Sequence, residues 1–165
     1  MLQPCGSTPY CTYWRVAVGC SSKPAAFLAQ TAAGIRDMLS VWGDDYSTPD
    51  GSCIRDYIYV CDLAKAHVAA LERVTVKSAA MKDNMEYYNL GTGRGLSVLE
   101  VIDIFKRANK IDVPFRIADR RAGDVEQVWA DPSKANRELG WSADTPIEEV
   151  MQSAWRWEKK IRGLE

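Results

Sequence analysis

The stretch YYNLGTGRGLSVLEVI, residues 87–102, indicates the class of fold for the whole 165-residue chain. Aromatic residues in 86–90 favour a strand, and the glycines of 91–95 favour a tight turn. Ser97 and Glu100 follow at the spacing of a capping box, in which two side chains bond the backbone at the start of a helix. A strand, a turn and a capped helix in succession predict an α/β or α+β domain.

The same glycines raise the alternative of a dinucleotide-binding turn. That fingerprint reads GxGxxG, and its third glycine lets the helix pack closely on the strand. Gly91 and Gly93 fit the first two positions, but Leu96 occupies the third. The acid expected about 20 residues further on should end a second strand, whereas Asp112 precedes one. We therefore interpret 91–95 as a tight turn that does not bind NAD.

Strand-like and helical patterns alternate on both sides of this stretch. Strands are predicted at 39–42, 54–60, 86–90 and 113–118, and helices in 27–39, after Asp62, after Ser97, after Asp131 and after Thr145. Residues 1–24 hold three of the five cysteines and have no clear period. We therefore divide the chain into an atypical N-terminal segment, 1–24, for which disorder is one interpretation, and one domain, 25–165.

The overall charge and the cysteines limit the classes of function. With 21 basic and 22 acidic residues the net charge is −1, so no long-range field favours nucleic acid or an anionic membrane. No apolar run reaches the roughly 18 residues of a membrane span. The sequence has one histidine, His67, and no pair of cysteines at metal-binding spacing, so no metal site is expected. Reduced thiols in the cytoplasm are the simplest interpretation.

The loop DRRAGDVEQVWAD, residues 119–131, concentrates charge where no helical or strand period exists. Because the net charge is near zero, any anion site must be local, and the pair Arg120–Arg121 offers one. A solvated loop and a loop that grips a diphosphate both fit this pattern. Arg55 and Asp56, on the strand predicted at 54–60, could likewise form only a surface ion pair.

Four segments together resemble the C-terminal part of the UDP-glucose 4-epimerases, which are extended short-chain dehydrogenases/reductases. They are 43–72, 87–102, 119–141 and 153–160, in the order of that family. The resemblance covers roughly 27–160. It implies a nucleotide-sugar-binding domain together with the last strand and helix of a Rossmann sheet, whose N-terminal core is missing from this sequence.

The resemblance also implies a site for the diphosphate and the ribose. Arg55 and Arg121 would contact the diphosphate of UDP, and Asp124 would hold the ribose. Guanidinium suits phosphate because its planar fork of donors matches pairs of phosphate oxygens. Arg120 is expected to be structural or to face solvent.

The uracil and the sugar are assigned by the same resemblance. Ser40, Val41 and Trp42 would lie against the uracil. Val128 would lie near the sugar ring, at a position where some members carry tyrosine. The alternative for Val128 is that it only packs under Trp129.

The family's chemistry needs parts that this sequence does not contain. The resemblance implies NAD as cofactor, UDP-glucose and UDP-galactose as substrates, and a homodimer formed through the N-terminal half. The base of the family is the tyrosine of YxxxK, and none of the seven tyrosines here has a lysine four residues later. We therefore assign no catalytic residue and expect the chain to be inactive alone. A truncated gene, or a frame error upstream of about Pro24, would explain this.

Two functional hypotheses remain from the sequence. The first is the UDP-sugar-binding part of an epimerase whose other half is supplied elsewhere or was lost. The second is a non-catalytic fragment that binds UDP-sugar weakly or not at all.

Overall fold

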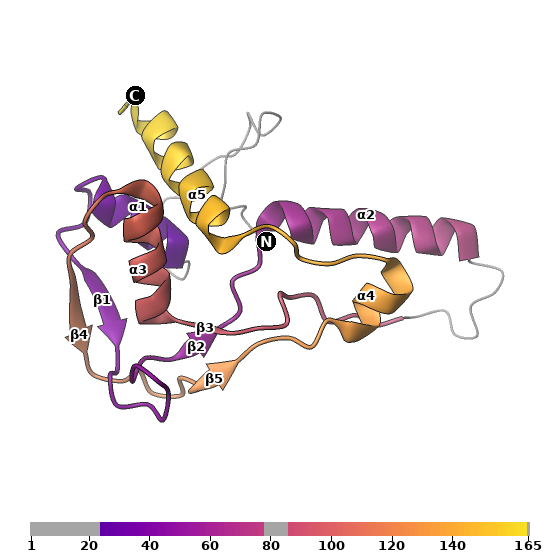
Figure 1. Ribbon diagram of the computed structural model, residues 1–165, viewed down its shortest axis with the longest axis horizontal. Helices are drawn as coiled ribbons and strands as arrows, with labels where there is room; N and C mark the ends of the chain where they lie inside the picture. Colours follow the sequence, from indigo (N-terminus) through magenta and orange to yellow (C-terminus); the bar gives the residue numbers. More distant parts are fainter. Residues whose placement is uncertain (1–23, 78–85, 165) are drawn as a thin grey trace.

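A computed structural model describes residues 24–77 and 86–164 of the chain (Figure 1). The helices of this part are α1 (Pro24–Ala32), α2 (Val60–Lys77), α3 (Val98–Asn109), α4 (Ser133–Leu139) and α5 (Ile147–Arg162). The strands are β1 (Leu39–Trp42), β2 (Ile54–Arg55), β3 (Leu96–Ser97), β4 (Phe115–Ala118) and β5 (Gln127–Val128). The segment 1–24 lies outside the described residues except for Pro24, which begins α1. The mixed helix and strand content confirms the predicted class of fold.

The strands form two small sheets. β1 and β4 run parallel, with Leu39 opposite Phe115 and Trp42 opposite Ala118. The second sheet has the order β3-β2-β5, in which β2 is antiparallel to β3 and parallel to β5. Its register sets Arg55 opposite Val128. The loop between β4 and β5 therefore begins beside Trp42 and returns beside Ile54, the residue before Arg55.

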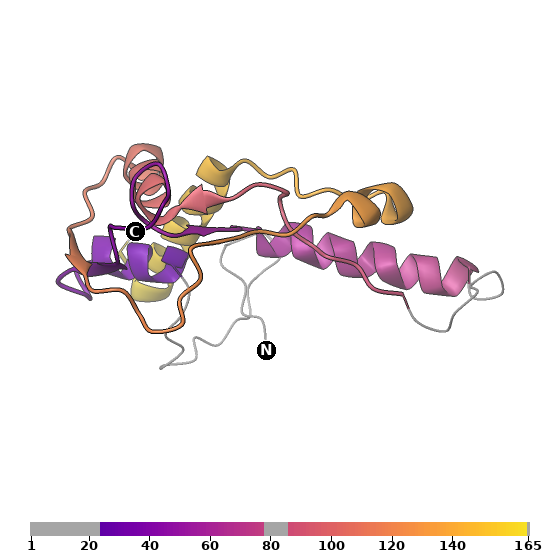
Figure 2. The same cartoon turned by 90° about the horizontal axis from the view of Figure 1, so that it is seen from below.

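The main hydrophobic core lies between α1, α3, α5 and the first sheet. Phe105 is its fully buried centre, and Leu28, Val41 and Met151 are 1% exposed around it. Trp155 meets the Phe105 ring edge-on, with 6.4 Å between the ring centroids. In Figures 1 and 2 this part forms one end of the elongated molecule, and α2 and α4 form the other.

A smaller cluster holds α2 and α4 together. Ala66, Ala135 and Trp141 are its buried members. The indole Nε1 of Trp141 donates to the carbonyl oxygen of Asp62 at 2.7 Å, and the buried Asp62 carboxylate accepts from the backbone N–H of Thr145 at 3.1 Å. These bonds join the start of α2 to the segment that leads into α5.

Several predicted boundaries were correct. The Ser97 hydroxyl accepts from the Glu100 backbone N–H at 3.0 Å, and the Glu100 carboxylate accepts from the Ser97 N–H at 2.8 Å. The capping box is therefore confirmed. The helix predicted after Asp131 begins at Ser133, with Pro132 as its N-cap and no side-chain cap bond. Asp131 accepts from the N–H of Ser133 at 3.0 Å, and Gly140 ends the helix in the left-handed conformation.

Three other predicted boundaries were wrong. Of the strand predicted at 54–60, only Ile54–Arg55 pairs with neighbours, and Val60 already belongs to α2. The segment 86–90 is extended but has no ladder partner in the described part of the chain. The helix predicted in 27–39 ends at Ala32, followed by Gly34 at a φ of 72°.

Candidate functional site

Arg55 and Asp124 form the centre of the candidate site. Nη2 of Arg55 lies 2.7 Å from Oδ1 of Asp124, and both side chains are about one quarter exposed. Nη1 of Arg55 donates to the carbonyl oxygen of Ile54 at 2.7 Å, and more weakly to that of Glu126 at 3.3 Å. The alternative of a local Arg55–Asp56 ion pair is wrong, because Asp56 accepts from other segments. A residue 69 positions away completes the pair instead.

Arg121 lies over Trp42 at the end of β1. Its guanidinium carbon is 4.4 Å from the centroid of the indole ring, a cation–π contact. The contact follows from the parallel pairing of β1 and β4, because Trp42 stands opposite Ala118 and the loop turns back from there. Both side chains are exposed, so the cation and the ring face solvent together.

Arg120 has a different set of partners. Its Nε donates to Asp45 at 2.5 Å, a second nitrogen donates to the Asp45 carbonyl, and the guanidinium lies 4.0 Å from the centroid of the Tyr46 ring. The hydrogen bond to Asp45 raises the pKa of Arg120. Arg120 thus ties the 43–52 loop to the 119–131 loop, which agrees with the structural role expected for it. Asp45 was not identified from the sequence, because acids are frequent in solvated loops.

The glycine between these groups is required by the space available. Gly43 has a φ of 82°, a conformation that side chains disfavour. A Cβ there would lie 2.6 Å from the Tyr46 ring and 2.8 Å from Cγ of Arg120. Glycine at this position therefore leaves room for the Tyr46 ring and the Arg120 side chain to lie against the backbone.

The charges of three predicted site residues act on one buried thiol, that of Cys53. Burial raises the pKa of this thiol; Arg55 and Arg121 lower it, and Asp124 raises it further. Cys53 directly precedes β2 and is 8% exposed. The charges of Arg55, Arg121 and Asp124 thus all act at the start of β2.

The remaining predicted residues occupy different environments. Ser40 is partly buried, and its hydroxyl accepts from Arg116 at 3.4 Å. The side chain of Val41 is 1% exposed and packs in the main core, so only its backbone is available to a ligand. Val128 is 51% exposed and lies opposite Arg55 in the β2–β5 ladder.

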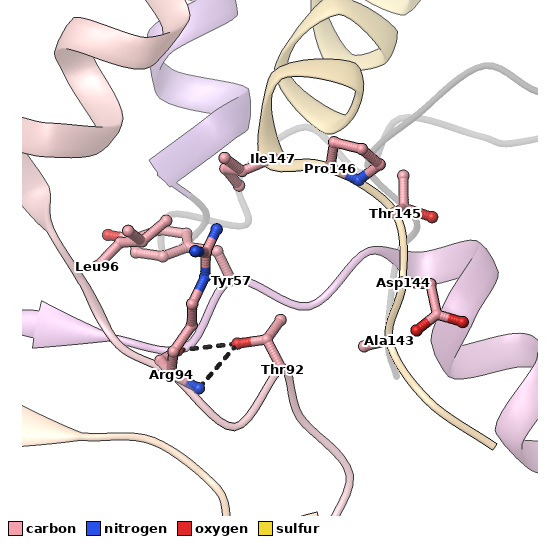
Figure 3. Close-up of a pocket in the computed structure, with 9 residues that line it drawn as sticks. All are labelled: Tyr57, Thr92, Arg94, Leu96, Ala143, Asp144, Thr145, Pro146 and Ile147. Atoms are coloured by element: carbon pink, nitrogen blue, oxygen red, sulfur yellow. Dashed lines mark hydrogen bonds between the residues drawn. The ribbon is translucent and has the colours of Figure 1, made fainter. Parts of the chain in front are cut away.

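A separate small pocket of about 160 Å³ lies between the glycine turn and the start of α5 (Figure 3). Tyr57, Arg94 and Leu96 form one side of it, and Thr145, Pro146 and Ile147 form the other. The side chain of Arg94 points into the gap between these two sides. None of the residues assigned to the UDP-sugar lines this pocket.

The glycine turn is not an open cradle for NAD. A Cβ on Gly91 would lie 2.2 Å from the Asp56 carboxylate, and one on Gly95 would lie 2.2 Å from Ile54 and 2.8 Å from the ring of Trp129. Protein atoms, including a carboxylate, fill the space that a diphosphate would need. The residues of the turn do not fit the cofactor, so we derive no step through it. The geometry favours the tight-turn interpretation.

Residues 24–77 and 86–164 contain neither a membrane-spanning helix nor a cluster of metal ligands. Within these ranges no helix is long and apolar enough to cross a membrane. The same ranges contain no group of three or more metal-ligating side chains. His67 is exposed, and its Nδ1 contacts the carbonyl oxygen of Leu63 at 2.7 Å.

Several proteins similar in sequence to this chain are named UDP-glucose 4-epimerase. UDP-glucose 4-epimerase of Bacillus subtilis is 49% identical over 132 residues, which are 80% of this chain and 38% of that protein. The mouse protein of the same name is 42% identical over 134 residues, 81% of this chain and 37% of that protein. The chain thus spans less than two fifths of the length of these relatives, and it matches their C-terminal portion.

Solved structures of such epimerases have the same fold. The enzyme of Stenotrophomonas maltophila, with bound NAD and formylated UDP-arabinopyranose, superposes with a TM-score of 0.84 at 40% identity, over 91% of this chain and 43% of its own. The enzyme of Bifidobacterium longum, in complex with NAD⁺ and UDP, gives 0.78 at 42% identity, over 87% and 41%.

By fold, therefore, the described part corresponds to the C-terminal part of an extended short-chain dehydrogenase/reductase. Residues 18–154 match the family model described as GDP-mannose 4,6 dehydratase, and the chain belongs to this family of NAD-dependent epimerases and dehydratases.

Proposed function

We propose that this chain is the UDP-sugar-binding part of an enzyme of the UDP-glucose 4-epimerase type, which when complete interconverts UDP-galactose and UDP-glucose in the cytoplasm. The main support is the convergence of Arg55, Asp124 and Arg121 beside the exposed ring of Trp42. NAD would be bound by the half that the chain does not contain, and the family's homodimer would form through that half.

Each part of the proposed site suits one part of the ligand. Arg121 has no carboxylate partner among the ion pairs of the described residues, so its guanidinium is available to a diphosphate. Arg55 is held by Asp124 and would share its remaining donors with the same phosphates. A carboxylate such as Asp124 accepts hydrogen bonds from ribose hydroxyls. The Trp42 ring and the backbone at Val41 would form the surface for the uracil.

The test is a titration of the chain with UDP, in which NMR chemical shifts report binding. We expect a dissociation constant near or above roughly 1 mM, about −4 kcal/mol, because the chain spans less than two fifths of the length of its relatives. Arg121→Ala should weaken binding by about tenfold, since a charge-assisted hydrogen bond contributes ~1.5–3 kcal/mol.

Arg120→Ala is the matched control. It removes a neighbouring arginine whose partners are Asp45 and Tyr46, so affinity for UDP should stay within about twofold of the original value. Equal losses from the two variants would reject the assignment of Arg121. No binding by the original chain would favour the alternative, a fragment that does not bind UDP-sugar.

A further inference from the structure

Asp56 joins three segments that lie far apart in the sequence. It directly follows β2, and its carboxylate accepts from the Thr92 hydroxyl at 2.7 Å, from the Thr92 N–H at 3.1 Å and from the Ala130 N–H at 3.2 Å. Thr92 belongs to the glycine turn, and Ala130 lies two residues after β5. One carboxylate thus satisfies backbone groups on two other segments, and all of its partners are donors.

The glycine turn is shaped to bring these donors close. Gly91 and Gly95 would clash with Asp56 and Ile54 if either carried a Cβ, each at 2.2 Å. The Thr92 hydroxyl also accepts from the N–H of Arg94 and contacts its carbonyl, which fixes the turn internally (Figure 3). The turn therefore supports β2 and the chain that follows β5.

This arrangement fixes residues 126–130 at both ends. At one end the Ile54 N–H donates to the carbonyl oxygen of Glu126 at 2.9 Å, and at the other Asp56 accepts from Ala130 at 3.2 Å. Val128 and Trp129 lie between these two points, about half exposed. The β2–β5 ladder spans only two residues, so the second attachment is needed to hold this segment in place.

We propose that Asp56 is a positioning residue for the nucleotide-sugar site. It does not contact the ligand. It holds 126–130 in the position that sets Val128 beside Arg55 and the Glu126 carbonyl within reach of the Arg55 guanidinium. This inference rests on the proposed function, because the site that it serves is the UDP-sugar site.

The test uses the full 165-residue chain and the variant Asp56→Asn. Asparagine keeps the shape but turns an NH₂ toward donors, so at least one hydrogen bond is lost. We expect the Ala130 amide to exchange with solvent about tenfold faster and UDP to bind about threefold more weakly, because a partly buried N–H that loses its acceptor opens to solvent more often. Thr92→Val should likewise speed up Ala130 exchange and weaken UDP binding. Thr92→Ser retains the hydroxyl, so its exchange rate and its affinity for UDP should match those of the original chain.

Tyr88→Phe separates positioning from loss of stability. It removes the hydroxyl bonds to Glu86, at 2.6 Å, and to Glu138, at 3.0 Å, in a different part of the molecule. We expect it to lower stability without changing Ala130 exchange or UDP binding at a temperature where all variants are folded. Equal effects on UDP from Tyr88→Phe and Asp56→Asn would overturn the positioning role, as would an unchanged Ala130 exchange rate in Asp56→Asn.

The two proposals fail in different ways. An original chain that does not bind UDP overturns the proposed function. The exchange rate of Ala130 is measured without ligand, so it still decides whether Asp56 positions 126–130.

Discussion

At the scale of single residues, similar side chains in one loop have different environments. Arg120 and Arg121 are adjacent, yet Arg120 pairs with Asp45 and Arg121 lies on the ring of Trp42. The sequence distinguishes them only through the family resemblance, because charge and spacing are the same for both. The structure supplies the physical difference, which is whether a carboxylate partner is present.

Val128 leads to a prediction about the choice of sugar. Its side chain is 51% exposed beside Arg55, and valine lacks the aromatic ring that some members carry at this position. The pocket of a complete enzyme should therefore be wide enough for an N-acetyl group, because a wall residue excludes a substrate by steric overlap. Residues 26–165 fused to a related N-terminal half should accept UDP-N-acetylglucosamine as well as UDP-glucose.

The matched variant is Val128→Tyr in the same fusion. It should reduce turnover of the N-acetyl sugar by about tenfold or more and leave UDP-glucose turnover within about threefold, the range that one wall residue usually controls. Equal rejection of the N-acetyl sugar by both forms would contradict the prediction.

At the scale of elements, one ionic cluster joins α2, the segment 86–90 and α4. Arg73 donates to Glu86 at 2.5 and 2.9 Å and to the Glu138 carboxylate at 3.1 Å, and the Tyr88 hydroxyl donates to both acids. The side-chain bonds of this cluster hold the segment 86–90, which has no strand ladder in the described part of the chain. The pattern of 86–90 favoured a strand, but a strand needs a partner, and side chains take that role in the described part.

The cluster predicts sensitivity to acid. The hydrogen bond from Arg73 is the main cause that lowers the pKa of Glu86 to about 2, from an ordinary value of 4.5. A carboxyl whose pKa is lower in the folded state stabilises the fold above its unfolded pKa and loses that contribution as the pH falls through its folded pKa. Stability should therefore decrease between about pH 5 and pH 2.

Urea unfolding at several pH values checks this prediction. Glu86→Gln should be less stable than the original chain at pH 7, and the difference should shrink toward pH 2. Glu72→Gln, at an exposed glutamate next to Arg73 in the sequence, is the control. Its stability should equal that of the original chain both at pH 7 and near pH 2. A difference between Glu86→Gln and the original chain that does not depend on pH would show that Glu86 is not titrating in this range.

At the scale of the whole molecule, α2 has an uncovered apolar face. Leu71 and Val74 lie on this face and are 66% and 53% exposed, and Val68 is 55% exposed. Helical periodicity identifies an apolar stripe without showing what covers it. The short helix α4 packs on the opposite side of α2, where Ala66 and Ala135 are buried together.

We therefore expect the purified chain to self-associate through the apolar face of α2 and through the segment 86–90, whose backbone has no strand partner in the described part. Light scattering should show oligomers at tens of micromolar, and Leu71→Lys should shift the distribution toward the monomer. Ile35→Lys changes an apolar residue that is 45% exposed outside this face and should have little effect. A clean monomer of the original chain at that concentration would contradict the expectation.

The sequence by itself determined the local features, because their causes are local. The Ser97–Glu100 capping box, the end of α4 at Gly140 and the alternation of strands and helices follow from residues a few positions apart. The motifs of 43–72, 87–102 and 119–141 were enough to indicate the family, which the comparisons confirm.

The tertiary structure alone decided which distant groups meet. The pairing of Arg55 with Asp124, the position of Arg121 on Trp42 and the three bonds to Asp56 join residues separated by 36 to 79 positions. No periodicity or cap encodes such contacts, because they depend on how β1 pairs with β4 and β2 with β5. Strand pairing is settled only when the whole chain packs, so the site is a property of the fold and not of any one motif.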